Sequence, residues 1–169
     1  MLIESFNNKT VLITGHTGFK GAWLSSWLLQ LGANVIGISL DPPTQPSHFT
    51  SSGITSYISD YRVDIRSQGE LENIILTTQP DYIFHLAAQA LVRESYSNPF
   101  ETWEINVIGT LNLLEVLRKL NKSCSAVIIT SDKCYENVEW VWGYREIDRL
   151  GGKDPYSASK GMAELAIRS

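Results

Sequence analysis

The chain has 169 residues, of which 43% are hydrophobic and 19% are charged, and its net charge is −4 at pH 7. This length is near the size of one domain, and the composition is that of a globular protein. The acidic balance argues against a nucleic-acid surface, which needs a basic stripe. No apolar run is long enough to cross a membrane, and the N-terminus lacks the basic start and apolar middle of a signal peptide. We therefore expect a cytoplasmic protein that binds neither nucleic acid nor membrane.

The two cysteines, Cys124 and Cys134, have neither metal-ligand spacing nor enough partners for a disulfide framework. We expect reduced thiols and no metal site. Cys134 lies beside residues that we consider catalytic below. We nevertheless expect Cys134 to be a small buried hydrophobic residue.

The first informative stretch runs from Thr10 to Gly21. An apolar, β-branched run over residues 10–14 is followed by Gly15, Gly18 and Gly21, and apolar residues then recur at helical spacing over residues 22–31. This order predicts a strand, a glycine turn and a helix, in which the backbone can approach a pyrophosphate at the positive end of the helix dipole. The alternative is an ordinary tight turn, because glycines at this spacing are a weak signal alone.

The remaining elements follow in an alternating order. We expect further strands over residues 34–40, 57–63, 81–86 and 124–130. We expect helices that include residues 70–76 and stop before Pro80, over residues 100–120, and from 155 onward. This order predicts an α/β fold of the Rossmann type, a doubly wound parallel sheet with helices on both faces. The fifth strand is nearly all apolar, so we expect it to be covered on both faces. Ligands should bind at the carboxyl ends of the strands.

Asp41 follows the second strand, about twenty-five residues after the first glycine of the turn, where NAD-binding folds place a carboxylate on the adenosine ribose. A carboxylate there would repel the extra phosphate of NADP. The alternative is that Asp41 only begins the turn at Pro42 and Pro43.

Other candidate cofactor residues lie in the turn and after later strands. Asp64 and Ile65 suit the edge and face of an adenine, although a surface turn explains them equally well. Small side chains after the fourth strand would let a nicotinamide ribose and pyrophosphate lie against the backbone. His16 and Lys20 could add positive charge near the pyrophosphate. The expected cofactor residues of the turn and fourth strand are Gly15, Thr17, Gly18, Phe19, Lys20, Gly21, Leu86, Ala87 and Ala88.

Two groups of residues carry candidate chemistry. Ser131, Asp132 and Lys133 follow the fifth strand in succession. Tyr156 and Lys160 stand four apart on a predicted helix, so both project from one face. A protonated lysine close to a phenol favours the phenolate, which can then accept a proton from a sugar hydroxyl. A tyrosine and lysine at this spacing are common by chance, and a surface pair is the alternative outside this fold.

Two pairs of tryptophans and one histidine have structural roles as their first or equal interpretation. Trp23 and Trp27, four apart on the first long helix, are expected in the core. Trp140 and Trp142 suit a lid over a sugar site or ordinary loop packing, with equal support for each. His85 ends a buried strand and is expected to be a hydrogen-bonded core residue.

Taken together, these motifs resemble the extended short-chain dehydrogenase/reductase superfamily and its NAD-dependent epimerase/dehydratase family. Within that family, the stretches 130–135 and 139–146 and the loop at Pro42 and Pro43 resemble the nucleotide-sugar 4,6-dehydratases that act on CDP-glucose. The motifs that carry the resemblance are Thr14 to Gly21, Ala87–Ala88, Asn106 with Gly109 and Thr110, Ser131–Asp132–Lys133, and Tyr156 with Lys160.

The resemblance implies a lyase with an internal hydride cycle on bound NAD. Tyr156, with Lys160 lowering its pKa, would take the proton of the sugar 4-hydroxyl, and both residues would also contact the cofactor. Ser131 would hydrogen-bond the 4-oxygen, and Asp132 would protonate the departing 6-hydroxyl. Lys133 stands where related enzymes carry glutamate, and it would act either as the base at carbon 5 or only as a group that orients and polarises.

The resemblance also implies partners and a domain boundary. The substrate would be CDP-glucose or another nucleotide sugar, and the protein would be a homodimer. Relatives are about twice this length, so residues 1–169 would form an incomplete NAD-binding Rossmann domain without the nucleotide-sugar-binding part. Two alternatives stay open, namely another epimerase or dehydratase of the extended family and a non-catalytic NAD-binding fragment.

Overall fold

The computed structural model describes residues 2–169, with the side chains from residue 4 onward. The chain divides into two compact units, Met1–Ala87 with Glu115–Ile129, and Ala88–Leu114 with Thr130–Ser169. No helix in the described part of the chain is both long and apolar enough to cross a membrane.

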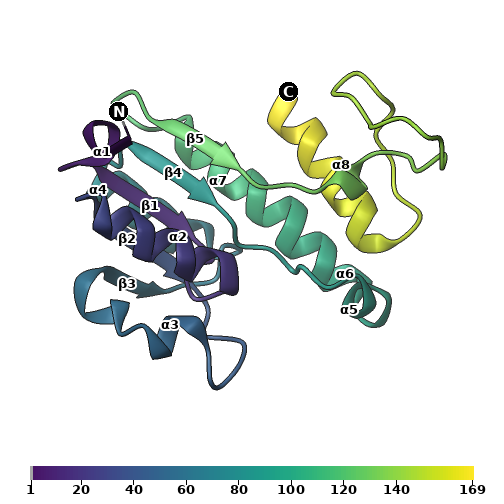
Figure 1. Ribbon diagram of the computed structural model, residues 1–169. Helices are drawn as coiled ribbons and strands as arrows, with labels where there is room; N and C mark the ends of the chain where they lie inside the picture. The colour runs from purple at the N-terminus through teal and green to yellow at the C-terminus, as the bar shows by residue number, and fades with distance from the viewer. Residues whose placement is uncertain (1) are drawn as a thin grey trace. The chain divides into compact units, whose positions relative to one another are not determined.

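A parallel five-stranded sheet forms the centre of the first unit (Figure 1). Its order is β3-β2-β1-β4-β5, so the direction of winding reverses between β1 and β4. The predicted doubly wound α/β class is therefore confirmed, and the crevice expected for ligands lies at the carboxyl ends of β1 and β4. The strands are β1 (Thr10–Thr14), β2 (Asn34–Ser39), β3 (Ser59–Arg62), β4 (Tyr82–His85) and β5 (Ser125–Ile128).

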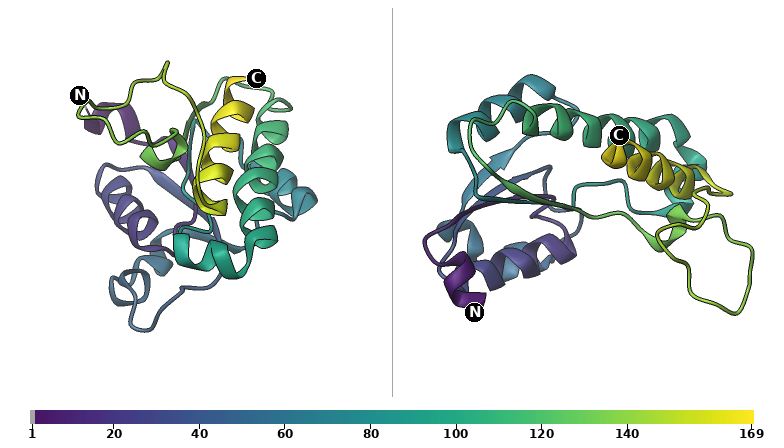
Figure 2. Two further views of the ribbon diagram at one scale, coloured as in Figure 1. Left: turned by 90° about the vertical axis from the view of Figure 1, so that its right-hand side faces the viewer. Right: turned by 90° about the horizontal axis from the view of Figure 1, so that it is seen from above.

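Helices cover both faces of this sheet, as the view from above in Figure 2 shows for α2 and α4. The central strand β1 is buried at Val11, Leu12 and Ile13, because apolar side chains on both of its faces meet helices. Leu28 of α2 packs in the same core as Val11 and Ile13. The helical segments of this unit are α1 (Leu2–Phe6), α2 (Phe19–Gln30), α3 (His48–Ser51), the 3₁₀ turn η1 (Ile54–Tyr57) and α4 (Gln68–Thr78).

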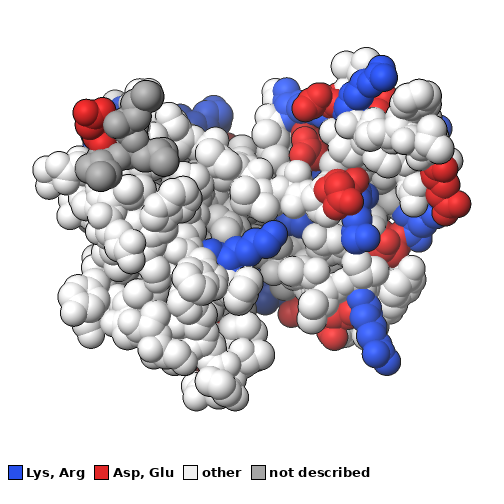
Figure 3. Space-filling model, in the orientation of Figure 1, with Lys and Arg blue, Asp and Glu red and all other residues white. Residues whose placement is uncertain are grey.

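The prediction that Trp23 and Trp27 lie in the core is wrong. Their side chains are 55% and 53% exposed, because α2 buries the opposite face through Ala22, Ser25 and Leu28. The Trp23 ring stacks on His48 of α3 at a centroid distance of 4.1 Å. The surface over α2 carries few charged side chains (Figure 3).

The fifth strand also differs from its prediction. β5 pairs with β4 alone and lies at the edge of the described sheet. Its residues Ser125, Ala126 and Val127 are exposed, so the strand is not covered on both faces. Its apolar composition resembles that of a buried strand, and composition alone does not distinguish the two situations.

The second unit is mainly helical. It contains α5 (Val92–Ser97), α6 (Pro99–Trp103), the π-helical turn η2 (Glu104–Ile108), the 3₁₀ turn η3 (Asp132–Cys134) and α8 (Pro155–Arg168). The helix predicted over residues 100–120 is present, but its middle turn is η2, from which α7 (Gly109–Leu117) continues. α8 begins where predicted, because Asp154 Oδ1 accepts a hydrogen bond from Ser157 N at 2.9 Å and Pro155 occupies the first position.

Candidate functional site

The glycine turn brings the backbone of β1, the start of α2 and the end of β4 very close together. Gly15 has a φ of +77°, and a Cβ on it would lie 2.8 Å from Ala87 N. A Cβ on Gly21 would lie 2.1 Å from the carbonyl oxygen of Gly15. Gly18 precedes α2, and no side chain caps that helix. The first N–H groups of α2 are therefore available to an anion such as a pyrophosphate.

A buried histidine fixes the other side of the turn. Thr14 Oγ1 and His85 Nδ1 lie 2.7 Å apart, and Ala87 N donates to the same threonine oxygen at 3.1 Å. His85 is 2% exposed, which confirms the expected core histidine. The Leu86 N–H also donates to the Thr14 carbonyl at 3.1 Å. Thr14, at the end of β1, thus holds both Leu86 and Ala87 in place.

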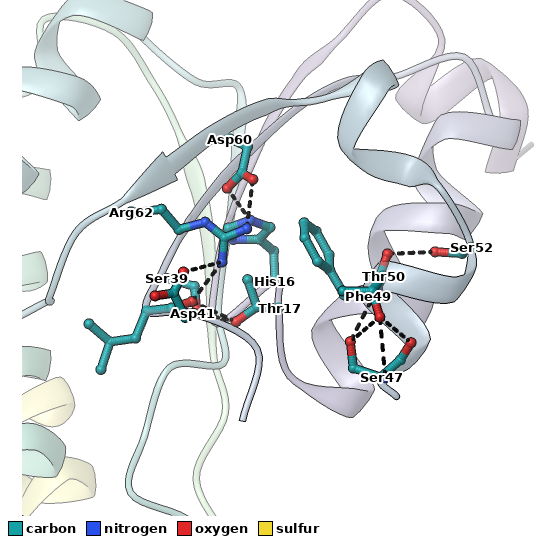
Figure 4. A network of polar contacts seen from close by, with 11 residues as sticks. His16, Thr17, Ser39, Asp41, Ser47, Phe49, Thr50, Ser52, Asp60 and Arg62 are labelled. Carbon is teal, nitrogen blue, oxygen red and sulfur yellow. Dashed lines mark hydrogen bonds and ion pairs between the residues drawn. The ribbon is translucent and has the colours of Figure 1, made fainter. Parts of the chain in front are cut away.

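Hydrogen bonds from the turn and from β3 converge on the end of β2, where Asp41 begins a loop (Figure 4). Thr17 Oγ1 lies 2.7 Å from Ser39 Oγ and donates to the carbonyl of Leu40 at 3.0 Å. Thr17 is 4% exposed, so its hydroxyl serves the fold rather than an open site. The Asp41 side chain is 92% exposed, with Arg62 Nη1 3.7 Å from its Oδ1. Asp41 is therefore free to accept hydrogen bonds from a ribose.

The expectation that His16 adds positive charge to the turn is wrong. His16 is fully buried, and burial lowers its pKa, even though Asp60 acts in the opposite direction. Its Nε2 lies 2.8 Å from Asp60 Oδ1, so the neutral ring donates to that carboxylate. A Cβ on Gly37 of β2 would lie 2.4 Å from this ring. His16 is thus a packed structural residue beneath the turn, whereas Lys20 is exposed on α2.

The adenine candidates after β3 show different exposure. Asp64 accepts hydrogen bonds from Arg66 Nη2 at 2.6 Å and from Arg66 Nε at 3.0 Å, and this guanidinium lowers the pKa of Asp64. Ile65 is 4% exposed, so its side chain packs in the interior and offers no open face to an adenine. Phe19, the first residue of α2, is 75% exposed, in contrast to the buried Ile65.

In the second unit, α8 carries the two residues predicted to handle a proton. Tyr156 is 8% exposed and Lys160 is 6% exposed, one helical turn apart. Burial lowers the pKa of Lys160 to about 8, because desolvation penalises the ammonium form. A Cβ on Gly161 would lie 3.3 Å from the Cys134 carbonyl, so α8 and η3 pack closely.

The three consecutive residues Ser131, Asp132 and Lys133 are therefore brought to α8 by the η3 turn. Ser131 caps this turn, since its Oγ accepts from Lys133 N at 3.2 Å and donates to Asp132 Oδ1 at 3.1 Å. Asp132 and Lys133 are exposed, and they line a hollow of about 480 Å³ together with Asp154 and other residues of this unit. Lys133 is therefore open to solvent at this hollow.

The loop between η3 and α8 contributes aromatic rings to this hollow. Tyr135 and Tyr144 stack with their ring centroids 5.4 Å apart, and the Trp140 ring lies 5.5 Å from Tyr144. Trp140 is 46% exposed and Trp142 is 70% exposed. Trp140 thus takes part in loop packing, and Trp142 extends into solvent.

Asn106 connects the segments around this helix. Its Nδ2 donates to Ser159 Oγ at 2.9 Å and to the Gln89 carbonyl at 3.0 Å, and its Oδ1 accepts from Gln89 N at 2.9 Å. Ala88, a predicted cofactor residue, directly precedes Gln89. The sequence analysis missed Ser159, because a serine inside a helix carries no signal without the partner that it meets.

Comparisons with known proteins place this site in context. Residues 12–169 match the family described as GDP-mannose 4,6 dehydratase. The chain is 51% identical over 166 residues to CDP-glucose 4,6-dehydratase of Salmonella typhimurium, covering 98% of this chain and 46% of that protein. It is 34% identical to CDP-paratose 2-epimerase of Salmonella typhi, covering 91% of this chain and 50% of that protein.

Two solved structures of epimerases are also similar to this chain. The Thermus thermophilus UDP-glucose 4-epimerase in complex with NAD matches with a TM-score of 0.79 and 28% identity, over 94% of this chain and 50% of that one. The Thermotoga maritima UDP-glucose 4-epimerase with UDP-glucose matches with a TM-score of 0.80 and 27% identity, over the same shares. The chain thus spans about half the length of the curated relatives that it matches.

Proposed function

The chain belongs to the GDP-mannose 4,6 dehydratase family, and on this premise we propose that it carries the cofactor-binding and catalytic residues of a CDP-glucose 4,6-dehydratase. The proposed reaction converts CDP-glucose to CDP-4-keto-6-deoxyglucose, which makes the protein a lyase. One observation carries the proposal. Tyr156 and Lys160 are buried on a helix that packs against the turn with Ser131, Asp132 and Lys133, in a chain similar over nearly its whole length to such an enzyme.

The proposed cofactor is NAD, and the glycine turn fits it. The space around Gly15 and Gly21 excludes any side chain, which suits a turn that meets a pyrophosphate through its backbone. Asp41 offers an exposed carboxylate for the adenosine ribose. When bound, NAD supplies a hydride acceptor that later returns the hydride, so the reaction needs no external oxidant. The proposed cofactor residues are Gly15, Thr17, Gly18, Phe19, Lys20, Gly21, Asp41, Asp64, Ile65, Leu86, Ala87, Ala88, Tyr156 and Lys160. The side chains of Thr17 and Ile65 are buried, so these two residues would contribute only their backbone groups.

We propose that Tyr156 begins the reaction as a base. Its phenolate accepts the proton of the sugar 4-hydroxyl while carbon 4 is oxidised to the ketone. Lys160 favours the phenolate, because an ammonium close to a phenol stabilises its ionised form. Ser131 supports the step by a hydrogen bond to the 4-oxygen.

The elimination follows from the acidity of carbon 5 beside the new ketone. We propose that Lys133 removes the carbon 5 proton and that Asp132 protonates the 6-hydroxyl as it leaves as water, which leaves a double bond between carbons 5 and 6. Carbon 6 then receives the returned hydride and carbon 5 regains a proton, which completes the 4-keto-6-deoxy product. Lys133 is exposed in this structure, so bound substrate must first exclude water from it before the neutral amine can act. The alternative role for Lys133 is to orient and polarise the substrate.

The test is incubation with CDP-glucose and NAD, with the 4-keto product followed by its absorbance in alkali. We expect product from the full-length protein, none from Tyr156→Phe and much less from Asp132→Asn, with Arg118→Ala as a control far along the chain from these residues. To assign Lys133, the reaction is run in deuterium oxide with Lys133→Met. Loss of solvent exchange at carbon 5 supports the base role, and retained exchange assigns orientation.

A second candidate function is an epimerase of the same family, which the similarity to CDP-paratose 2-epimerase favours. An epimerase has no use for an acid at the 6-oxygen, and Asp132 therefore argues for the dehydratase. The same incubation separates the two, because an epimerase returns a sugar nucleotide of unchanged mass, whereas the dehydratase product has lost water.

We also propose that the protein is a cytoplasmic homodimer and that residues 1–169 are its NAD-binding domain, with the nucleotide-sugar-binding part outside this sequence. Large apolar side chains exposed on the helices of the second unit support the dimer. Phe100 is 74% exposed, Leu165 is 53% exposed and Met162 is 46% exposed. Analytical ultracentrifugation of the wild type and of Leu165→Glu tests this proposal.

A further inference from the structure

Arg62, the last residue of β3, contacts both ends of the loop that carries Asp41 (Figure 4). Its Nη1 donates to the carbonyl oxygen of Leu40 at 2.9 Å, where the loop begins. Its guanidinium carbon lies 5.1 Å from the ring centroid of Phe49 in α3, where the loop ends. Phe49 is 2% exposed, so this second contact point belongs to the core of the unit.

The guanidinium of Arg62 is itself held by Asp60, which His16 holds in turn. Its Nη2 donates to Asp60 Oδ2 at 2.8 Å, and Asp60 Oδ1 accepts from His16 Nε2 at 2.8 Å. The sheet register places Arg62 directly beside Ser39, the last residue of β2. Because a guanidinium is planar and presents its N–H groups in a fixed fork, these partners determine its orientation.

We propose that Arg62 is a positioning residue for the dinucleotide, which fixes the loop at Leu40 and Phe49 so that Asp41 meets the adenosine ribose. This inference rests on the proposed function, because the role of Asp41 belongs to the NAD site. Both terminal nitrogens of Arg62 already donate to acceptors of the protein. These bonds hold the guanidinium beside the loop, and we assign it to act through Asp41.

The charge of the cluster agrees with this role. The carboxylates of Asp41 and Asp60 both face the one guanidinium of Arg62, at 3.7 Å and 2.8 Å, so an excess negative charge is retained. This negative charge suits a ribose with two free hydroxyls, whereas it repels the 2′-phosphate of NADP. Arg62 beside Asp41 thus stabilises the loop without converting the site to one for NADP.

The test is calorimetric binding of ADP-ribose, which contains the adenosine ribose and the pyrophosphate. Four chains are compared, namely the wild type, Arg62→Ala, Asp41→Asn and the double variant. We expect Arg62→Ala to weaken binding about five- to tenfold in the wild-type background and less than about twofold beside Asp41→Asn, because coupled residues are not additive. Arg118→Ala is the matched control, since this exposed arginine pairs with Glu115 on α7.

Arg62→Lys separates positioning from simple charge attraction. Lysine keeps the positive charge but lacks the fork that reaches Leu40 and Asp60 together, so we expect it to recover less than half of the lost binding energy. Full recovery with lysine, or an equal loss in both Asp41 backgrounds, overturns the inference. Melting temperatures show which variants fold, and Arg62→Gln replaces Arg62→Ala if the latter does not.

The same titrations distinguish a failure of this inference from a failure of the proposed function. A wild-type chain that binds no ADP-ribose contradicts the NAD site itself, and the inference falls with it. A wild type that binds ADP-ribose, with unchanged affinity in Arg62→Ala, contradicts only the positioning role.

Discussion

The side-chain amide of Asn106 donates a hydrogen bond of 2.9 Å to the hydroxyl of Ser159, and this bond joins the π-helical turn to α8. Ser159 in turn donates to the carbonyl of Tyr156 at 2.7 Å and directly precedes Lys160. The remaining donor and the acceptor of the amide are used by the backbone of Gln89. A single buried amide therefore joins the proton-handling helix to the segment that follows β4.

Replacement of Asn106 by alanine should destabilise the fold. Asn106 is 1% exposed, and the change leaves the N–H and carbonyl of Gln89 without this partner. We expect the free energy of unfolding to fall by about 2–4 kcal/mol, measured by urea denaturation. Asn121→Ala, at an exposed position after α7, should change it by less than about 0.5 kcal/mol. A loss below about 1 kcal/mol for Asn106→Ala would contradict the bridging role.

Tyr156→Phe removes one oxygen from a buried ring and leaves its packing intact. If Tyr156 is the proton acceptor, turnover of CDP-glucose by the full-length enzyme should fall by about 10²- to 10⁴-fold. Binding of ADP-ribose should stay within about twofold of the wild type, because this probe lacks the nicotinamide. Parallel loss of ADP-ribose binding would instead indicate a folding defect.

Lys160 should make stability depend on pH in a defined direction. Its pKa is lowered to about 8 in the folded chain, from an ordinary value of 10.5. The unfolded chain therefore binds more protons between these values, and the contribution of Lys160 to stability rises as pH increases through this window. Relative to Lys160→Met, the wild type should gain about 3 kcal/mol in free energy of unfolding between pH 7 and pH 10.5. Denaturation curves of both chains at these pH values measure the difference, and a pH-independent difference would exclude a buried ammonium.

Two glycines provide a paired test of the turn. Gly21→Ala places a Cβ 2.1 Å from the Gly15 carbonyl oxygen, so the turn must deform. We expect ADP-ribose binding to be lost and the free energy of unfolding to fall by about 2 kcal/mol or more. Gly69→Ala in α4 meets nothing within 4 Å and should stabilise the chain by about 0.5–1 kcal/mol. A tolerated Gly21→Ala would mean that the turn does not need close backbone contact.

The sequence predicts the sheet well because its strands are marked by dense local signals. β1 matches its predicted bounds, and β2 and β4 lie within theirs, since each apolar run ends at a turn residue. The short α3 was missed because it follows a proline-rich loop and depends on a cap between Ser47 and Thr50. The π-helical turn at Asn106 was missed because periodicity does not distinguish it from an α-helical turn.

Some residues of the candidate site could be predicted from the sequence, and others only from the structure. Gly15, Gly21 and the pair on α8 could be named from the sequence, because their spacing occurs within the strand–turn–helix order and together with the other motifs of the family resemblance. Asp60 and Arg62 could not, because their importance arises only when β3 lies beside β2. The exposure of Trp23 was also beyond the sequence, since both faces of α2 carry apolar side chains and no period shows which face packs.

The close fit of the His16 ring over Gly37 has an evolutionary consequence. A side chain at position 37 would occupy the volume of the imidazole, so neither position can vary freely while the other is unchanged. A lineage that gains a β-branched residue at position 37 must first exchange His16 for a smaller residue, and it then loses the ring that holds Asp60. In homologous sequences, the residues at positions 16, 37 and 60 should therefore change as a set.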